Sequence, residues 1–125
     1  MNDYQKMVKE FHVAFAAPAP DRLDLSAVRR TLRAALIKEE ALEFQEAAHQ
    51  VDYVGMIDAL CDLLYVTFGT AVEMGIDLDQ YFREVHRSNM SKLVNGRPLL
   101  RVDGKILKGP NYTPPDLKGI LNNEL

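Results

Sequence analysis

The chain has 125 residues, a mass of 14.1 kDa and a formal net charge of −3, with 47% hydrophobic and 26% charged residues. A chain of this length fits one domain that buries about two thirds of its unfolded surface, so we expect a single domain over residues 1–125. The pI near 5.6 argues against general binding to nucleic-acid polymers or anionic membranes, because neither polyanion attracts an acidic surface.

Two further absences concern the location of the protein. The N-terminal residues 1–12 lack the apolar core of a signal peptide, and no run of 18 uncharged apolar residues occurs. We therefore expect a cytoplasmic protein. The single cysteine, Cys61, stands in an apolar stretch, which predicts a buried structural thiol without a disulfide.

The first helix is expected over residues 3–16, where Pro18 and Pro20 end it. Its apolar side chains fall on one stripe: Met7, Val8, Phe11, Ala14 and Phe15. A second, long helix is expected from a cap at Asp21 or Asp24 to about residue 50. Its charged face carries three arginines and three glutamates: Arg29, Arg30, Arg33, Glu39, Glu40 and Glu43.

The third helix is expected from a cap at Asp52 to Met74, with Gly75 as its stop. It is apolar nearly all round, which predicts a place in the middle of a bundle. Three short neighbours cover such a helix poorly. We therefore expect association as a homodimer or a dimer of dimers.

A fourth helix is expected to start at Asp77 or Asp79, with five residues inward: Tyr81, Phe82, Val85, Met90 and Leu93. Residues 99–108 are typical of a small hairpin around an Asp103-Gly104 turn, and a short last helix is expected over residues 116–121. The fold class is thus all-α, a four-helix bundle over about residues 1–93 with an extended C-terminal arm over about 94–125.

Two acid clusters fall on consecutive predicted helices: Glu39-Glu40-x-x-Glu43 and Asp58-x-x-x-Asp62. Helical residues three or four apart share a face, so two neighbouring helices can direct these carboxylates into one cleft. Hard oxygen ligands suit Mg²⁺, and Mn²⁺ can substitute. The alternatives are a solvated helix face for the glutamates, and ion pairs to Arg30 or Arg33 for the aspartates.

A second polar set lies on the fourth helix, where Asn89 and Lys92 share a face. An amide and an ammonium there can bind a base or sugar and a phosphate. The alternative is a polar helix end with Lys92 near the negative end of the dipole. His12 and His86 are interpreted as packing or surface residues.

The acid clusters, with Asp62-Leu63-Leu64-Tyr65-Val66 about fifteen residues after the glutamates, resemble the all-α nucleoside triphosphate pyrophosphatases. These include the MazG-like, phosphoribosyl-ATP-pyrophosphohydrolase-like and dimeric dUTPase-related proteins. Further motifs extend the resemblance to a MazG-like subgroup over nearly the whole chain: Glu10-Phe11-His12, the run from Glu84 to Lys92, Asp103-Gly104-Lys105, and the run from Lys108 to Tyr112.

The resemblance implies magnesium-dependent cleavage between the α and β phosphates, giving a nucleoside monophosphate and pyrophosphate. It implies that Glu39, Glu40, Glu43 and Asp62 bind metal, and that Asn89 and Lys92 contact nucleotide. The family pattern E-x-x-D would put Glu at position 59, where this chain has Ala59; Asp58 is the nearest substitute.

On this basis Glu40 is the candidate that orients or deprotonates the attacking water. Lys105 or Lys108 would join Lys92 on the β and γ phosphates. Tyr112 is a candidate for stacking on the base, although packing of the arm is the preferred interpretation. The hypothesis is a housecleaning pyrophosphohydrolase, and the alternatives are a non-catalytic nucleotide or metal sensor and a helical interaction protein.

Overall fold

The computed structural model describes residues 1–125 and contains five helices and no strand. The all-α prediction is therefore confirmed. The chain divides into two compact units, Met1–Leu78 and Asp79–Leu125, and each is described by itself. The helices are α1 (Asp3–Ala14), α2 (Ala27–His49), α3 (Tyr53–Met74), α4 (Leu78–Met90) and α5 (Leu117–Glu124).

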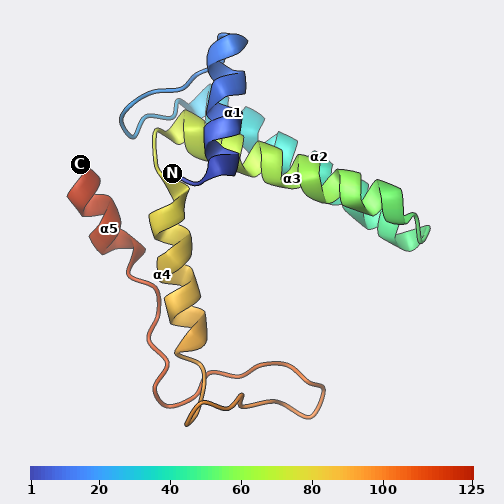
Figure 1. Cartoon of the computed structure of the whole chain (residues 1–125), viewed down its shortest axis with the longest axis vertical. Helices are drawn as coiled ribbons and strands as arrows, with labels where there is room; N and C mark the ends of the chain where they lie inside the picture. Colours follow the sequence, from blue (N-terminus) through green and yellow to red (C-terminus); the bar gives the residue numbers. More distant parts are fainter. The chain divides into compact units, whose positions relative to one another are not determined.

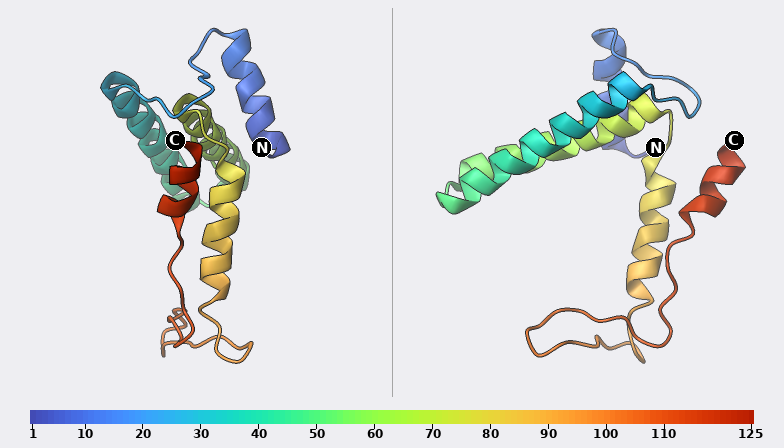
Figure 2. Two further views of the ribbon diagram at one scale, coloured as in Figure 1. Left: turned by 90° about the vertical axis from the view of Figure 1, so that its left-hand side faces the viewer. Right: turned by 180° about the vertical axis from the view of Figure 1, so that it is seen from behind.

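The first unit is a three-helix assembly. Helices α2 and α3 lie side by side and antiparallel along their whole length, joined by three residues (Figure 1). Helix α1 packs on the C-terminal part of α3, so the antiparallel pair extends well beyond it (Figure 2). Ring contacts mark this packing, between Tyr4 and Phe68 and between Phe11 and Tyr65.

The helix starts follow local capping chemistry. Asp52 caps α3 as expected, since its side chain accepts a hydrogen bond from the Gly55 amide. The predicted start of α2 was wrong: Ser26 is the cap and accepts from the Arg29 amide. The backbone N–H of Asp24 instead donates to the Met74 carbonyl at the end of α3, a tertiary contact that local sequence does not reveal.

Gly75 ends α3 as predicted, in the left-handed conformation with φ of +71°. A Cβ at this position would overlap the backbone carbonyl of Arg22, so both the conformation and the close approach require glycine.

We expect Gly75→Ala to destabilise the protein by at least about 1 kcal/mol, because it adds left-handed strain to a backbone clash. Urea unfolding of the variant measures this. Gly104→Ala is the matched control, since Gly104 also has positive φ but has open space around its Cβ. Equal losses for the two variants would contradict the role of the Arg22 contact.

A buried ion cluster ties α2 to the last turn of α3. The carboxylate of Glu73, 1% exposed, accepts two hydrogen bonds from Arg29 at 2.7 and 2.8 Å and one from Arg33 at 2.9 Å. Arg33 also donates to the Thr70 hydroxyl and to the Val66 carbonyl. Three residues of α3, spread over about two helical turns, are thus fixed against α2 by two arginines.

The interior of the first unit contains only small apolar side chains. Its buried apolar residues are Val8, Ala47, Ala59, Ala71 and Val72, and no Leu, Ile, Met or Phe of the chain is buried. Helix α3 packs against both α1 and α2, so it is the central helix of this unit as predicted, although one of its apolar sides stays exposed. Cys61 is exposed rather than buried, because it lines an open apolar groove between α1 and α3.

Helix α3 is also the one helix of the chain that is long and apolar enough to cross a membrane, judged by length and composition only. Core helices of soluble proteins share this length and composition.

The second unit combines α4, the extended segment and α5. Hydrogen bonds from Ser88 and Arg87 to Thr113 fix the segment on α4, and Asp116 caps α5 as expected. The predicted hairpin forms as one antiparallel bridge, Leu100 to Ile106, with backbone hydrogen bonds from Leu107 to Leu99 and from Arg101 to Lys105, but it contains no strand. Two predicted inward residues, Phe82 and Met90, are exposed, whereas Tyr81 is buried and donates to Glu124.

Candidate metal site

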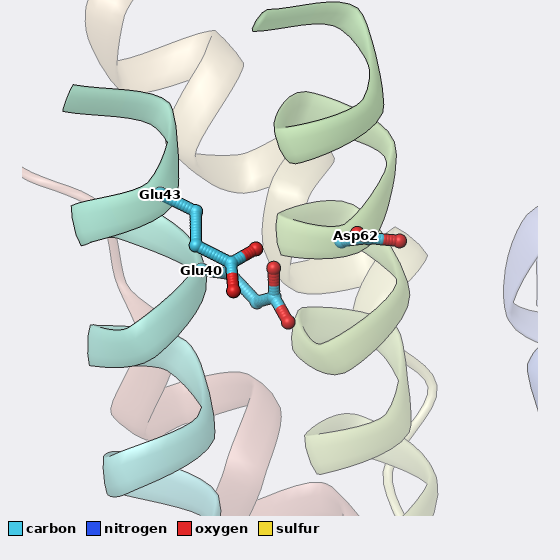
Figure 3. A group of neighbouring side chains, drawn as sticks. All are labelled: Glu40, Glu43 and Asp62. Carbon is cyan, nitrogen blue, oxygen red and sulfur yellow. The ribbon is translucent and has the colours of Figure 1, made fainter. Parts of the chain in front are cut away.

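Three of the predicted acids converge between α2 and α3. One carboxylate oxygen each of Glu40, Glu43 and Asp62 lies within 4.8 Å of the other two. Figure 3 shows Glu40 and Glu43 extending from α2 toward α3, which carries Asp62. This spacing is small enough for one cation to contact all three carboxylates.

The packing of α2 against α3 brings these three carboxylates together. Glu40 and Glu43 are three residues apart and so share one face of α2. Each helix carries a buried alanine, Ala47 on α2, which lies beside Gly55 of α3, and Ala59 on α3. Small side chains allow close approach of the two helices. Ala59 is buried, at the position where the family pattern has an acid.

The cluster raises the pKa of its own members. The pKa of Glu40 rises from 4.5 to about 7, first because its carboxylate is withdrawn from water and then because of Glu43, Asp62 and Glu39. Desolvation and the charges of Asp58 and Glu43 also raise the pKa of Asp62. One oxygen of Glu40 is buried without any hydrogen-bond partner, which is costly unless a cation or proton compensates it.

This electrostatic crowding predicts a pH dependence of the metal-free protein. A carboxyl whose pKa is raised by folding contributes stability that is fully present below pH 4.5 and is lost as pH rises through about 7. We expect the Tm of the wild type to fall relative to that of Glu40→Gln over this range. Thermal unfolding in EDTA measures both proteins. A constant Tm difference across the range would contradict the expected titration.

The other two predicted metal-binding acids, Glu39 and Asp58, lie outside this group and are exposed. Both still act on it through their charge, Glu39 on Glu40 and Asp58 on Asp62. Of the five predicted acids the structure thus brings three together.

No arginine neutralises the cluster. Arg29 and Arg33 bind Glu73, and Arg30 donates to the Leu25 carbonyl. The alternative in which Arg30 or Arg33 pairs with the aspartates of α3 is therefore contradicted. Sequence reasoning missed Glu73, although an acid in the last turn of an otherwise apolar helix, with three arginines on the preceding helix, was a signal for such a pair.

The predicted substrate-binding residues all belong to the second unit. Asn89 and Lys92 line a cavity of about 410 Å³ together with Met90, Leu93, Pro98 and Ile106. Lys105 and Lys108 do not line it. The ammonium of Lys108 instead lies 4.7 Å from the ring centre of Tyr112, a cation–π contact within the extended segment.

An all-α chain in which carboxylates of two adjacent helices meet, without a cationic partner, is compatible with a metal-dependent hydrolase of phosphate compounds. Residues 8–89, about two thirds of the chain, match the phosphoribosyl-ATP pyrophosphohydrolase family. The protein belongs to this family, within the MazG-like superfamily of all-α nucleoside triphosphate pyrophosphatases. No curated protein matches the chain significantly.

This membership supports a hydrolase that acts on nucleotide phosphoanhydride bonds. The family generally uses a divalent metal, and the matched region includes all three converging acids.

Proposed function

We propose that the protein is a cytoplasmic, magnesium-dependent nucleoside triphosphate pyrophosphohydrolase with a housecleaning role. It would cleave between the α and β phosphates to give a nucleoside monophosphate and pyrophosphate. The observation that carries the proposal is the meeting of Glu40, Glu43 and Asp62 without a cationic side chain, with one buried Glu40 oxygen lacking a partner.

The three carboxylates fit a magnesium ion. They offer hard oxygen ligands from two fixed helices, and Glu43 is exposed, which leaves room for water and phosphate ligands. Glu40, Glu43 and Asp62 would hold the ion, and Glu39 and Asp58 stay in the proposal as further metal-binding acids. When bound, the ion supplies charge neutralisation on the phosphates and on the pyrophosphate leaving group.

Glu40 is proposed as the general base. A carboxylate beside the metal site can orient the attacking water or take its proton. The water oxygen bonds to the α phosphorus while the bond from that phosphorus to the α–β bridging oxygen breaks. The proton of the water passes to Glu40, and pyrophosphate leaves with the bonding electron pair.

The cavity beside Asn89 and Lys92 is proposed to hold part of the nucleotide. Its floor is apolar, with Leu93, Pro98 and Ile106, which suits a base, and Lys92 offers an ammonium for a phosphate. Lys105 and Lys108 would add positive charge for the β and γ phosphates, and Tyr112 remains a candidate for contact with the base.

The test is a product assay. Purified protein with Mg²⁺ is given canonical and modified nucleoside triphosphates and phosphoribosyl-ATP, and monophosphate, pyrophosphate and orthophosphate are resolved. We expect equal amounts of monophosphate and pyrophosphate from at least one triphosphate. Orthophosphate alone would indicate another phosphohydrolase, and exclusive use of phosphoribosyl-ATP would replace the proposed substrate class.

A further outcome separates the enzyme from a non-catalytic sensor. A sensor using the same acids predicts a higher Tm with magnesium and nucleotide but no turnover of any substrate. That result would contradict the proposed hydrolase.

A further inference from the structure

The extended C-terminal segment is fastened to one face of α4 by polar side chains. We call this set the α4 clasp; it consists of Glu84, Arg87, Ser88 and Ser91. Their spacing of three and four residues puts all of them on one helical face. The chain passes beside α4 on its return to α5 (Figure 1, Figure 2). The hydrogen bonds between clasp and segment lie within the second unit.

The clasp bonds every polar group of Thr113. The Thr113 hydroxyl accepts from the Arg87 guanidinium at 2.6 Å, and the Thr113 carbonyl accepts from the Ser88 hydroxyl at 2.8 Å. The Thr113 N–H donates to the Ser91 hydroxyl oxygen at 2.9 Å. Because Ser88 is only 2% exposed, its hydroxyl bonds the segment in place of water.

The guanidinium of Arg87 is almost fully engaged. Besides the Thr113 hydroxyl, it donates to both carboxylate oxygens of Glu84, at 2.6 and 3.0 Å, and to the Pro114 carbonyl at 3.2 Å. These bonds use four of its five N–H groups. Glu84 also accepts from the Asp116 N–H, and these bonds from Arg87 and Asp116 lower the pKa of Glu84 to about 2. Arg87 therefore acts on the segment rather than on a substrate phosphate.

A glycine brings the same segment close to the end of α4. The Gly109 N–H donates to the Lys92 carbonyl at 3.3 Å. A Cβ on Gly109 would lie 2.5 Å from the Val94 side chain and 2.9 Å from the Lys92 carbonyl oxygen, so only glycine fits here without a shift. The Gly109 carbonyl accepts from the N–H of Tyr112, the residue before Thr113. Residues 109–113 are thus anchored to α4 at both ends.

This anchored chain supplies one wall of the nucleotide cavity. Pro98 and Ile106 line the cavity from the extended segment, and the other four lining residues lie between positions 89 and 93. Ile106 is three residues before Gly109. The N–H of the next residue, Leu107, donates to the Leu99 carbonyl at 2.8 Å, which ties the stretch containing Pro98 to the stretch containing Ile106. Release of the segment from α4 would therefore open this wall.

We propose that Arg87, Ser88 and Ser91 are positioning residues for the nucleotide cavity, because they hold its second wall, Pro98 and Ile106, beside α4. The inference rests on the proposed function, in which this cavity holds part of the nucleotide. A nucleotide that needs both walls binds only the clasped form, so its apparent affinity falls with the population of that form. Each lost hydrogen bond lowers this population by up to about tenfold. The acid cluster belongs to the first unit, so the chemical step itself should change little.

Two variants open the clasp by different routes. Ser88→Ala/Ser91→Ala removes both hydroxyls, and Arg87→Ala removes the guanidinium. Arg83→Ala is the matched control, because Arg83 is an exposed arginine of α4 whose carboxylate partner, Asp79, lies on the same helix. Ser91→Thr is the conservative variant, since it keeps the hydroxyl. Circular dichroism shows whether each variant keeps its helices, and Ser91→Ala alone replaces a double variant that does not.

Three measurements are made on the full chain. On the triphosphate that wild type cleaves fastest, both clasp variants should raise KM at least about fivefold and change kcat less than about twofold. The Kd for the α,β-methylene analogues of dATP, dCTP, dGTP and dTTP with Mg²⁺, measured by calorimetry, should rise for each analogue that wild type binds. Hydrogen–deuterium exchange over residues 98–113 should become faster. Arg83→Ala and Ser91→Thr should match wild type in all three.

Faster exchange with unchanged KM and Kd would overturn the inference, since the wall would then not matter for binding. Unchanged exchange in both clasp variants would overturn it too, as would equal losses in Arg83→Ala or a loss confined to kcat. No binding of any analogue by wild type would refute the cavity and the inference with it. Weaker analogue binding by the clasp variants, without turnover of any triphosphate by wild type, would support the inference and refute the proposed hydrolase alone.

Discussion

Replacing Asp62 by asparagine is expected to lower kcat/KM at least about a hundredfold, because the metal site loses one of its three carboxylates. Glu40→Gln is expected to lose between about 10² and 10⁴, since the general base is removed along with a metal ligand. Steady-state assays of pyrophosphate release at saturating magnesium measure both losses.

The same two variants, Asp62→Asn and Glu40→Gln, should be more stable than wild type when no metal is present. Like charges and desolvation raise the pKa values of Glu40 and Asp62, so neutral isosteres relieve repulsion in the absence of a cation. We expect each variant to have a higher Tm than wild type in EDTA at pH above about 7. Magnesium should raise the Tm of wild type but change that of the variants little.

Glu46→Gln is the control for these experiments, since Glu46 is an exposed acid of the same helix and lies outside the cluster. It should keep both wild-type activity and the magnesium-dependent rise in Tm. If Asp62→Asn and Glu46→Gln had the same activity, the acid cluster would not be the active site.

Replacing Glu73 by glutamine is the second large effect that we expect. It leaves Arg29 and Arg33 without their counter-ion in a buried setting and should cost about 3–5 kcal/mol of stability. Urea unfolding measures the loss. The matched control is again Glu46→Gln, which removes an exposed carboxylate and should change stability by less than about 0.5 kcal/mol.

The stability contributed by Glu73 and its two arginines depends on pH with the opposite sign to that of the acid cluster. Burial raises the pKa of Glu73, but hydrogen bonds from Arg29 and the charge of Arg33 more than offset this, so its pKa lies below 4.5. The stabilisation is therefore present above pH 4.5 and lost as pH falls through the lowered pKa. A wild-type protein whose acid unfolding is no steeper than that of Glu73→Gln would contradict this assignment.

Capping and helix-stop residues in the sequence predicted most of the helix boundaries. Asp52 and Gly75 bound α3 where expected, and Asp116 caps α5. These elements depend on residues within one turn of each other, so their sequence is sufficient. The start of α2 was misplaced because Asp24 is engaged by a carbonyl fifty residues away.

The candidate site was predicted only in part, for a related reason. Helical spacing identified the acids, and the matched family supports their chemistry, but spacing could not show that Glu40 rather than Glu39 faces Asp62. That choice depends on how α2 is rotated against α3. The rotation is fixed by the Glu73 cluster and by small buried residues such as Ala59, whose role appears only when the helices are in contact.

The exposure of Cys61 shows the limit of reading burial from apolar neighbours. An apolar helix indicates that something covers it, but not which molecule supplies the cover. In this unit α2 and α1 cover two sides of α3 and leave the stripe with Ile57 and Leu64 exposed.

Calorimetric titration of the metal-free protein with Mg²⁺ or Mn²⁺ tests the central claim most directly, with and without a nonhydrolysable triphosphate. We predict saturable uptake by wild type and by Glu46→Gln, and strongly weakened uptake by Asp62→Asn and Glu40→Gln. Absence of uptake by wild type under both conditions, or equal uptake by all four proteins, would contradict a metal site at Glu40, Glu43 and Asp62.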